Sequence, residues 1–182
     1  MPTTVDQTDA VFHLVWTYNI KAVDGRKKAR CVCDGSSRSG SVKVLDEVYA
    51  NCVDQTSARL FYAVAAAEYL LVFGSDVCNA FAEAPPPKQG FYICPDCTFN
   101  EWWENYKGNP PIPPGVIPVL STMQGHVESP RLWEKHTDTI LRDIGLIPTV
   151  HEPCLYSGMI YWKCIVFMRQ LDDFAIAAPD QH

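Results

Sequence analysis

CIVFMRQLDDFAIAA, at residues 164–178, places two adjacent acids, Asp172 and Asp173, between two apolar runs that we expect to form buried strands. A buried carboxylate pair is costly unless a cation or hydrogen-bond donors compensate it. The pair therefore predicts either a polar turn between two strands or a metal site. A second turn signal at Ser157-Gly158 lies upstream, so the C-terminal part of the sequence predicts two or three antiparallel strands.

The composition of the chain is that of a folded protein. Its 182 residues are 47% hydrophobic, which is enough for a sizeable core. The N-terminal residues are polar and show no secretory signal. The longest apolar stretch, residues 60–73, is interrupted by Glu68 and is too short to span a bilayer. We therefore expect an intracellular protein with no membrane partner.

The eight cysteines favour free thiols over disulfides, because a disulfide scaffold is normally a much shorter, exported chain. The Cys-x-x-Cys spacing of Cys94 and Cys97 leaves one alternative open, a zinc module that adds His151 and Cys154 as ligands. A single Cys-x-x-Cys without a second pair at regular spacing is a weak zinc signal.

Charge is unevenly distributed along the sequence. The net charge of -6 argues against non-specific electrostatic binding of nucleic acid by the chain as a whole. Residues 21–30, KAVDGRKKAR, nevertheless contain five basic side chains and only one acidic one. This basic cluster is either a solvated hairpin tip or a patch that meets phosphate groups.

Local signals predict the elements of the first half of the chain. Residues 11–33 are rich in β-branched and aromatic side chains around Asp24-Gly25, which predicts a β-hairpin. The stretch from Thr56 to Leu71 has a candidate cap in Thr56 and no Gly or Pro, which predicts a largely buried helix. A short apolar strand follows and ends just before Asp76.

The second half begins with a proline-dense segment, residues 84–118, which we expect to form loops around one short strand, GFYIC at 90–94. The next segment has Ser129 as a cap, Pro130 at the first helical position and a stop at Gly145, which predicts a helix.

Asp76 and the pair Asp172 and Asp173 share one context, because each follows an apolar strand. Neighbouring antiparallel strands would bring the three carboxylates together, and their repulsion would then require a divalent cation such as Mg²⁺ or Mn²⁺. Two such ions about 4 Å apart suit phosphoryl transfer. Taken singly, each acid is better explained as a turn residue or a helix cap.

Five motifs occur in the order found in one family. They are KARCVCDG at 28–35, SDVCNAF at 75–81, MQGHVESPRLW at 123–133, HEPCLY at 151–156 and RQLDDFAIAA at 169–178. In these motifs the chain resembles the reverse transcriptase of copia-type retrotransposons, over roughly residues 11–178. Five motifs in order are far more specific than any one of them.

The resemblance implies an α+β fold made of the fingers and palm of a polymerase, with an antiparallel palm sheet packed on helices. Residues 11–70 would be fingers-like and residues 71–182 would form the palm, with the proline-rich segment 84–118 as an insertion. We expect one partial domain, without thumb or RNase H.

The resemblance also implies roles for individual residues. The metal-binding carboxylates would be Asp76, Asp172 and, less directly, Asp173, with the backbone carbonyl of Val77 as a further ligand. Phe81 would crowd a ribose 2′-hydroxyl and so favour deoxynucleotides. The other residues expected to contact the nucleotide, by charge or position, are Lys28, Arg30, Gln124 and Gly125.

The implied activity is RNA-directed DNA synthesis, in which a primer 3′-hydroxyl attacks the α-phosphorus of a deoxynucleoside triphosphate with Mg²⁺ or Mn²⁺ as cofactor. The implied partners are an RNA or DNA template with its primer, the nucleotide, and the rest of the retrotransposon polyprotein. The implied location is a cytoplasmic virus-like particle or the nucleus. The alternative is a palm fold without catalysis that acts as a binding or scaffold protein.

Some residues depart from the family pattern. Arg169 and Gln170 replace the apolar or aromatic residues that precede the acid pair, and Arg169 could pair with the acids in place of metal. Val127 and Glu128 stand where the family has Lys and Gln, which makes the nucleotide side more negative.

An aromatic group outside the motifs, Trp102, Trp103 and Tyr106, could stack on bases, but we favour a role in anchoring the proline-rich loops. His13 and His136 are expected to be packing or surface residues.

Overall fold

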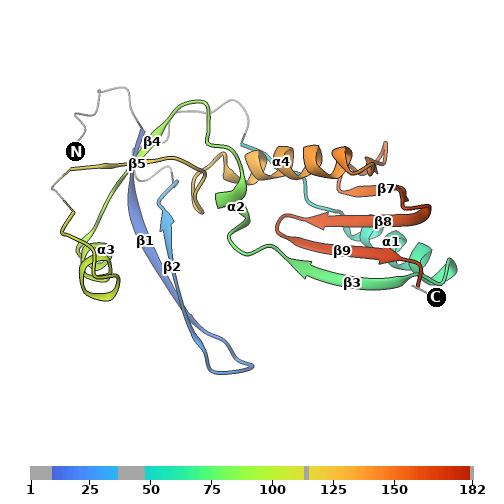
Figure 1. Ribbon diagram of the computed structural model, residues 1–182, viewed down its shortest axis with the longest axis horizontal. Coiled ribbons are helices and arrows are strands. Elements are labelled where there is room, and N and C mark those ends of the chain that lie inside the picture. The colour runs from blue at the N-terminus through green and yellow to red at the C-terminus, as the bar shows by residue number, and fades with distance from the viewer. Residues whose placement is uncertain (1–9, 37–47, 113–114, 181–182) are drawn as a thin grey trace. The chain divides into compact units, whose positions relative to one another are not determined.

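The computed structural model describes residues 10–36, 48–112 and 115–180, which form an α+β protein with two compact units (Figure 1). The first unit combines residues 10–36 with the described part of 84–129, and the second combines residues 48–83 with 130–180. Within the described ranges no helix is both long and apolar enough to cross a membrane.

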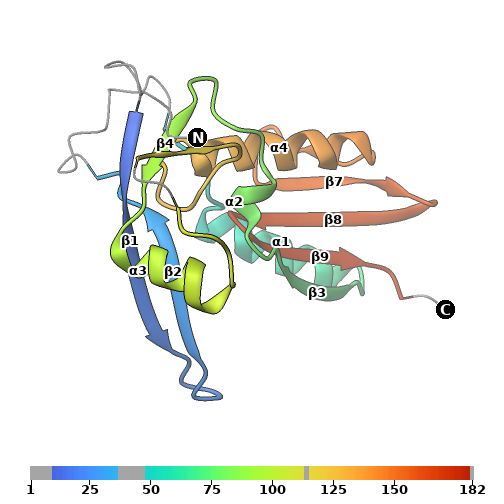
Figure 2. The ribbon, with the colours of Figure 1, turned by 60° about the vertical axis from the view of Figure 1, so that its left-hand side comes forward.

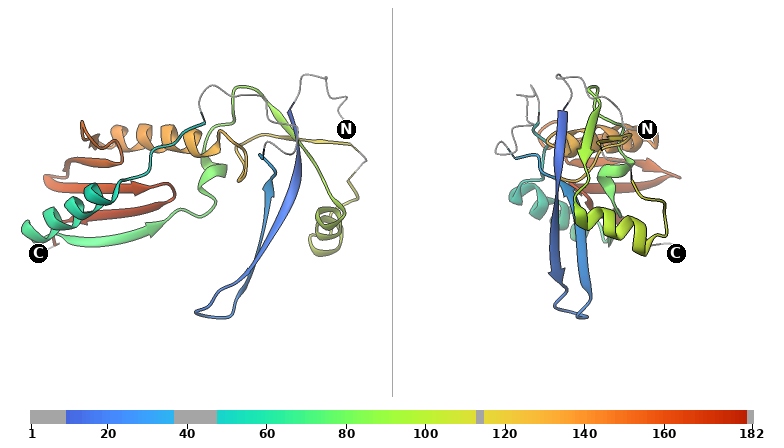
Figure 3. Two further views of the ribbon diagram at one scale, coloured as in Figure 1. Left: turned by 180° about the vertical axis from the view of Figure 1, so that it is seen from behind. Right: turned by 90° about the vertical axis from the view of Figure 1, so that its left-hand side faces the viewer.

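The first unit is built on a four-stranded sheet in the order β2-β1-β4-β5. Strand β1 (Ala10–Ile20) pairs antiparallel with β2 (Lys27–Cys33) and parallel with β4 (Phe91–Cys94), and β4 pairs antiparallel with β5 (Ile117–Val119). The hairpin predicted over residues 11–33 is therefore confirmed, and Figure 3 shows its two long strands from two further sides. Gly25 in its turn has φ +65°, which favours glycine.

Only the base of this hairpin is buried. Its core is a cluster of apolar side chains, namely Phe12, Leu14, Cys33, Phe91 and Ile93. Beyond Trp16 on β1 and before Cys31 on β2, every residue of both strands is exposed. The outer half of the hairpin is held by its own backbone pairing within this unit, and its side chains are available for contacts.

The proline-rich segment contains the predicted short strand as β4, but it also contains helical structure, so the expectation of only loops around that strand was wrong. A short helix, α3 (Cys97–Glu101), continues into a π-helical turn, η2 (Trp102–Tyr106). No proline lies between residues 96 and 109, and the Asp96 side chain accepts from the backbone N–H of Phe99 and so caps α3. The Trp103 indole donates to the carbonyl of Pro110 at 3.0 Å, which confirms that this aromatic residue anchors a proline-rich loop.

The second unit is built on a five-stranded antiparallel sheet in the order β3-β9-β8-β7-β6 (Figure 2). The strands are β3 (Leu71–Asp76), β6 (Ile147–Pro148), β7 (Leu155–Ile160), β8 (Lys163–Gln170) and β9 (Asp173–Ala178). The antiparallel C-terminal strands are confirmed. Strand β3 is exposed along its whole length, because it forms an edge of the sheet.

The turn predicted at Ser157-Gly158 was wrong, because both residues lie inside β7 and the chain reverses at Tyr161 and Trp162. Glycine at 158 serves close packing instead of a turn. A Cβ atom at this position would lie 2.2 Å from the carbonyl oxygen of Gly145, so a side chain would force two backbone segments apart.

Two helices cover opposite faces of this sheet. Helix α1 (Gln55–Ala67) buries Phe61 and Ala65 against Met168, Ala175 and Ala177. Helix α4 (Ser129–Asp143) contributes Leu141 to a separate cluster with Leu146, Tyr156 and Phe167. Because neighbouring residues of β8 and β9 alternate between these clusters, the two helices lie on opposite faces.

One detail of the predicted helices is confirmed and three need correction. Asp54, and not Thr56, caps α1, since its side chain accepts from the backbone N–H of Thr56 and Ser57. Helix α1 is largely exposed and buries only Phe61 and Ala65. Helix α4 ends before Gly145 as predicted, with φ +93° at that glycine. At the start of α4 the Ser129 hydroxyl donates a hydrogen bond to the carbonyl of Met123, 2.8 Å away. In this bond Ser129 is a donor, whereas the cap predicted from the sequence would accept from the backbone of the helix.

Candidate active site

Two of the predicted carboxylates lie directly opposite each other at one end of the five-stranded sheet. Asp76 is the last residue of β3 and Asp173 the first of β9, and the two are register partners. Both are exposed. Side chains of such partners have Cβ atoms about 5 Å apart, and like charges in this arrangement destabilise the sheet unless a cation lies between them. The two like charges therefore repel each other across the end of the sheet.

Asp172 lies in the two-residue turn between β8 and β9, together with Leu171. The turn predicted at Asp172-Asp173 thus begins one residue earlier. The carbonyl oxygen of Asp172 accepts a hydrogen bond from the backbone N–H of Val77 at 3.2 Å. Leu171 has φ +54°, a left-handed conformation that is unfavourable for a branched side chain and needs support from its surroundings. The structure thereby brings Asp76, Val77, Asp172 and Asp173 to one end of the sheet.

These donors fit one mode of magnesium binding. In the described ranges no group of three or more His, Cys, Asp or Glu side chains is placed to hold a metal ion, so the acids do not form a closed protein cage. Mg²⁺ commonly keeps several waters and is held by one or two carboxylates together with substrate phosphates. The Asp76 and Asp173 pair, next to Asp172, matches that open arrangement in both donor type and number.

Helix α4 supports the acidic turn at two adjacent residues. The Trp133 indole N–H donates to the carbonyl of Leu171 at 2.9 Å, and the Trp133 ring stacks on Phe174 with centroids 6.4 Å apart. Next to it, Glu134 forms an ion pair with Arg169 at 2.9 Å. The turn that carries Asp172 is thus fixed both through its backbone and through the strand that precedes it.

Arg169 does not pair with the acids as the sequence suggested. Its guanidinium is fully buried and bonds to Glu134 and to the Cys154 sulfur. Arg169 is the register partner of Phe174, which packs in the cluster on the α4 side. Asp173 alternates with Ala175 and Ala177, which pack on the α1 side. The cation and the Asp173 carboxylate therefore point to opposite faces of the sheet.

Phe81 follows the acidic end of β3 closely. It lies in a one-turn helix, α2 (Ala80–Glu83), and is half-buried. The turn between β3 and α2 includes Asn79 in the left-handed region, with φ +54°. Phe81 follows Asp76 by five positions in the sequence, and both belong to the second unit.

Lys28 and Arg30 lie on the exposed outer half of the β1–β2 hairpin in the first unit, opposite Asn19 and Thr17. The other face of this hairpin is aromatic, because Trp16 and Tyr18 stack there with centroids 6.4 Å apart. An open hollow of about 460 Å³ at the tip is lined by Tyr18, Asn19, Ile20, Lys27, Lys28 and Ala29. The basic cluster is thus a solvent-exposed ribbon with one cationic and one aromatic face.

Gln124 and Gly125 are fastened to the base of this hairpin. The Gln124 carbonyl accepts from the backbone N–H of Cys33 at 2.8 Å. Gly125 has φ +89°, and a Cβ atom there would lie 2.0 Å from the carbonyl oxygen of Cys33. Glycine is required at this position by backbone contact as well as by conformation.

His126 is a buried residue that the sequence gave no reason to single out. Its ring lies against Phe12 and Phe91, with centroids 5.1 and 4.4 Å away, and its Nδ1 accepts from the backbone N–H of Glu128. Burial lowers the pKa of His126 to about 4, so it is a neutral core residue near pH 7. No periodic apolar pattern surrounds it in the sequence, which is why its burial was missed.

The zinc alternative finds no support within either unit. Cys94 and Cys97 belong to the first unit, whereas His151 and Cys154 belong to the second. Burial raises the pKa of the Cys154 thiol to about 12, which disfavours the thiolate that zinc requires. All eight cysteines are free thiols.

Comparison with known proteins adds no assignment. No protein-family model matches the chain, and no curated protein or solved structure matches it significantly.

Proposed function

We propose that this chain is part of an RNA-directed DNA polymerase of the copia retrotransposon type, with a palm sheet in the second unit and a fingers hairpin in the first. The observation that carries the proposal is the register of β3 and β9, which sets Asp76 against Asp173 beside Asp172. The five motifs in family order support it. The proposed partners are template, primer and deoxynucleotide, together with the rest of the retrotransposon polyprotein.

The proposed metal ligands and the reacting groups have separate roles, which follow from their chemistry. A bound Mg²⁺ or Mn²⁺ supplies charge neutralisation for phosphoryl transfer. Asp76, Asp172 and Asp173 offer the carboxylate oxygens that hold such a cation, and the bond from Val77 to Asp172 keeps the two strand ends together. The primer 3′-oxygen forms the new bond to the α-phosphorus, pyrophosphate leaves, and the hydroxyl proton passes to solvent.

The resemblance assigns nucleotide contacts to further residues, which belong to two different units. Lys28 and Arg30 present cationic side chains from an exposed strand, which suits contact with a triphosphate. Phe81 presents a half-buried ring that excludes a 2′-hydroxyl by shape. The resemblance also assigns nucleotide contact to Gln124 and Gly125, which lie on a turn bonded to β2 within the first unit.

The test is Mn²⁺ binding, measured by electron paramagnetic resonance, together with primer extension on a poly(rA) template with an oligo(dT) primer. We expect the wild-type chain to bind Mn²⁺ and to incorporate dTMP. The double variant Asp76→Asn with Asp172→Asn should lose both. Asp143→Asn, which removes an exposed acid at the end of α4, is the matched control and should retain both.

Failure of the wild-type chain to bind Mn²⁺ would overturn the proposal. Binding that depends on Asp76 and Asp172 without dTMP incorporation would instead favour the alternative function, a palm fold that binds without catalysis.

A further inference from the structure

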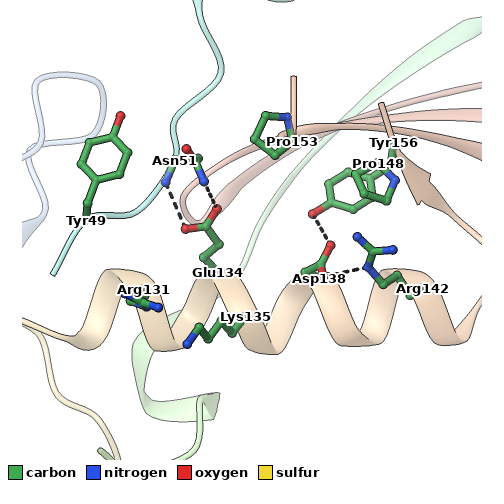
Figure 4. A pocket seen from close by; sticks show the side chains of 10 residues that line it. All are labelled: Tyr49, Asn51, Arg131, Glu134, Lys135, Asp138, Arg142, Pro148, Pro153 and Tyr156. Atoms are coloured by element: carbon green, nitrogen blue, oxygen red, sulfur yellow. Dashed lines mark hydrogen bonds and ion pairs between the residues drawn. The ribbon is translucent and has the colours of Figure 1, made fainter. Parts of the chain in front are cut away.

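A cavity of about 330 Å³ lies along α4 within the second unit (Figure 4). Four of its lining residues, at positions 131, 135, 138 and 142, follow one another at intervals of four, three and four, which places them on one face of the helix. The other walls come from Tyr49 and Asn51 and from residues of β6, β7 and the segment between them. None of these residues belongs to the proposed metal or nucleotide sites.

The first of two acids that line the cavity, Glu134, is already bonded to the protein. Its carboxylate accepts from Arg169 Nη2 at 2.9 Å, from the backbone N–H of Asn51 at 3.0 Å and from the Asn51 side-chain amide at 2.8 Å. Arg169 is fully buried and forms an ion pair with this carboxylate. The negative charge of Glu134 is therefore compensated by the protein itself.

The second acid, Asp138, is compensated in a similar way (Figure 4). Its Oδ1 atom accepts from the Tyr156 hydroxyl at 3.0 Å, and its Oδ2 atom accepts from Arg142 Nε at 2.8 Å. Burial raises the pKa of Tyr156 to about 12, so the phenol keeps the proton that it donates. The ion pair with Arg142 balances the charge of Asp138.

The lining has an excess of positive charge. Together with Arg169 it contains four cationic side chains and two acids, which gives a net charge of +2. The charges of the two ion pairs cancel, and the excess corresponds to Arg131 and Lys135, which lie one turn apart on α4. The chain as a whole has a net charge of -6, so the cavity lining differs in sign from the protein as a whole.

A phosphate monoester is the anion that fits this charge. It carries about -1.5 to -2 at pH 7 and offers three acceptor oxygens, whereas a carboxylate carries a single charge. Arginine and lysine side chains on one helix face suit these oxygens. The lining also includes two prolines, Pro148 and Pro153, and the volume lies near the lower limit of small-molecule sites, about 300 Å³. An organic phosphate with one ring therefore matches the charge, the lining and the size of the cavity.

We propose that this cavity binds a small organic phosphate, whose phosphate group is held by Arg131, Lys135 and Arg142 and whose ring lies against Pro148 and Pro153. The site shares no residue with the proposed metal site and requires no divalent cation. Its test is therefore independent of the proposed polymerase activity.

The experiment is isothermal titration calorimetry of the whole chain with phenyl phosphate, in buffer with EDTA so that no divalent cation contributes. We expect one binding site per chain. Benzoate keeps the ring but carries one charge, so it should bind at least about tenfold more weakly. Inorganic phosphate lacks the ring and should also bind more weakly than phenyl phosphate.

Variants locate the site. Lys135→Gln should raise the dissociation constant for phenyl phosphate about fivefold, the upper range for an exposed ion pair. Arg131→Gln combined with Lys135→Gln should abolish measurable binding. Arg59→Gln removes an exposed cation from α1, on the other face of the sheet, and is the matched control that should bind as the wild type does. The double variant Asp76→Asn with Asp172→Asn should also bind as the wild type does. Thermal unfolding followed by circular dichroism checks that every variant folds.

Several results would overturn the inference. They are a wild-type chain that does not bind phenyl phosphate, an equal affinity for benzoate, and unchanged binding in the variant that lacks both Arg131 and Lys135. Loss of binding in the variant that lacks Asp76 and Asp172 would also overturn it, because the phosphate would then bind at the proposed metal site. A wild-type chain that binds phenyl phosphate but no Mn²⁺ would contradict the proposed function and support this inference.

Discussion

The two hairpins that carry the proposed functional charges are held in opposite ways. The β8–β9 hairpin bears its acids at a two-residue turn, and Trp133 of α4 contacts this turn at Leu171. Two residues before Leu171, the buried pair of Arg169 and Glu134 joins the same hairpin to α4. The β1–β2 hairpin bears its basic residues on an outer half that is exposed on both faces. Only its base is fixed, where Cys33 bonds to Gln124.

The difference matches what each charge has to do. A cation held by carboxylates requires ligand positions that do not move, so the acidic turn needs support from packed neighbours. A flexible phosphate chain is met well by long cationic side chains that adjust to it. The packed support of the acidic turn therefore suits the metal ion that it is proposed to bind. The exposure of the basic hairpin suits the phosphate groups that it is proposed to bind.

The largest expected effect comes from breaking the support of the acidic turn. Arg169→Ala removes one partner of a buried ion pair, and we expect the free energy of unfolding to fall by about 3 to 5 kcal/mol. Arg26→Ala at the tip of the basic hairpin breaks only an exposed contact with Asp24 at 3.7 Å and should have a negligible effect. Urea unfolding followed by circular dichroism measures both, and equal losses would contradict the contrast.

A second comparison tests the base of the basic hairpin against its tip. Gly125→Ala brings a Cβ atom into the backbone of Cys33 at a positive φ, and should cost about 3 kcal/mol. Gly25→Ala also has a positive φ, but nothing lies within 4 Å of its Cβ position, so the cost should be about 1 kcal/mol. The same unfolding assay applies, and an equal cost at the two glycines would show that the base is not fixed by this contact.

The base of the basic hairpin should also be sensitive to pH through His126. Its pKa is lowered from 6.5 to about 4 in the folded state, so the unfolded chain binds more protons between these values. The stability due to this residue is complete above pH 6.5 and is lost as pH falls toward 4, by about 2 kcal/mol between pH 7 and pH 5. His126→Gln should flatten the dependence by this amount, and an unchanged slope would mean that His126 is not buried neutral.

A smaller effect separates the acidic turn from the other turn of the same sheet. Trp133→Phe keeps an aromatic ring but removes the bond to the Leu171 carbonyl, which should cost about 1 kcal/mol. Trp162→Phe, in the turn between β7 and β8, changes a side chain that is 94% exposed and should have little effect on the unfolding midpoint. Similar losses in both variants would mean that the indole bond does not stabilise the acidic turn.

The sequence predicted the parts of the fold that depend on local signals. Asp24-Gly25 identified the first hairpin, and the acidic pair identified the last one to within a residue. The prediction failed where contacts with backbone that is distant in the sequence determine the local structure. Gly158 is glycine because Gly145 approaches it, so a turn signal there was misleading. Helix α3 was missed because flanking prolines outweighed the proline-free stretch between them.

The candidate site was predictable to a similar extent. The apolar runs before Asp76 and Asp172 predicted converging strand ends, and the register of β3 and β9 places Asp76 opposite Asp173. The partner of Arg169 was not predictable, because Glu134 lies 35 residues away on a helix whose polar positions look alike in sequence. An ion pair between two side chains far apart in the sequence produces no periodic pattern in the sequence from which it could be predicted.

The most direct test of the central claim is the thermal unfolding midpoint of Asp173→Asn and wild type, each with and without millimolar Mg²⁺. If Asp76 and Asp173 repel each other without a cation, Asp173→Asn should be more stable than the wild type in the absence of Mg²⁺. If Mg²⁺ binds between the two carboxylates, it should raise the unfolding midpoint of the wild type and not that of the variant. A wild-type midpoint that ignores Mg²⁺, with Asp173→Asn no more stable than wild type, would contradict the claim.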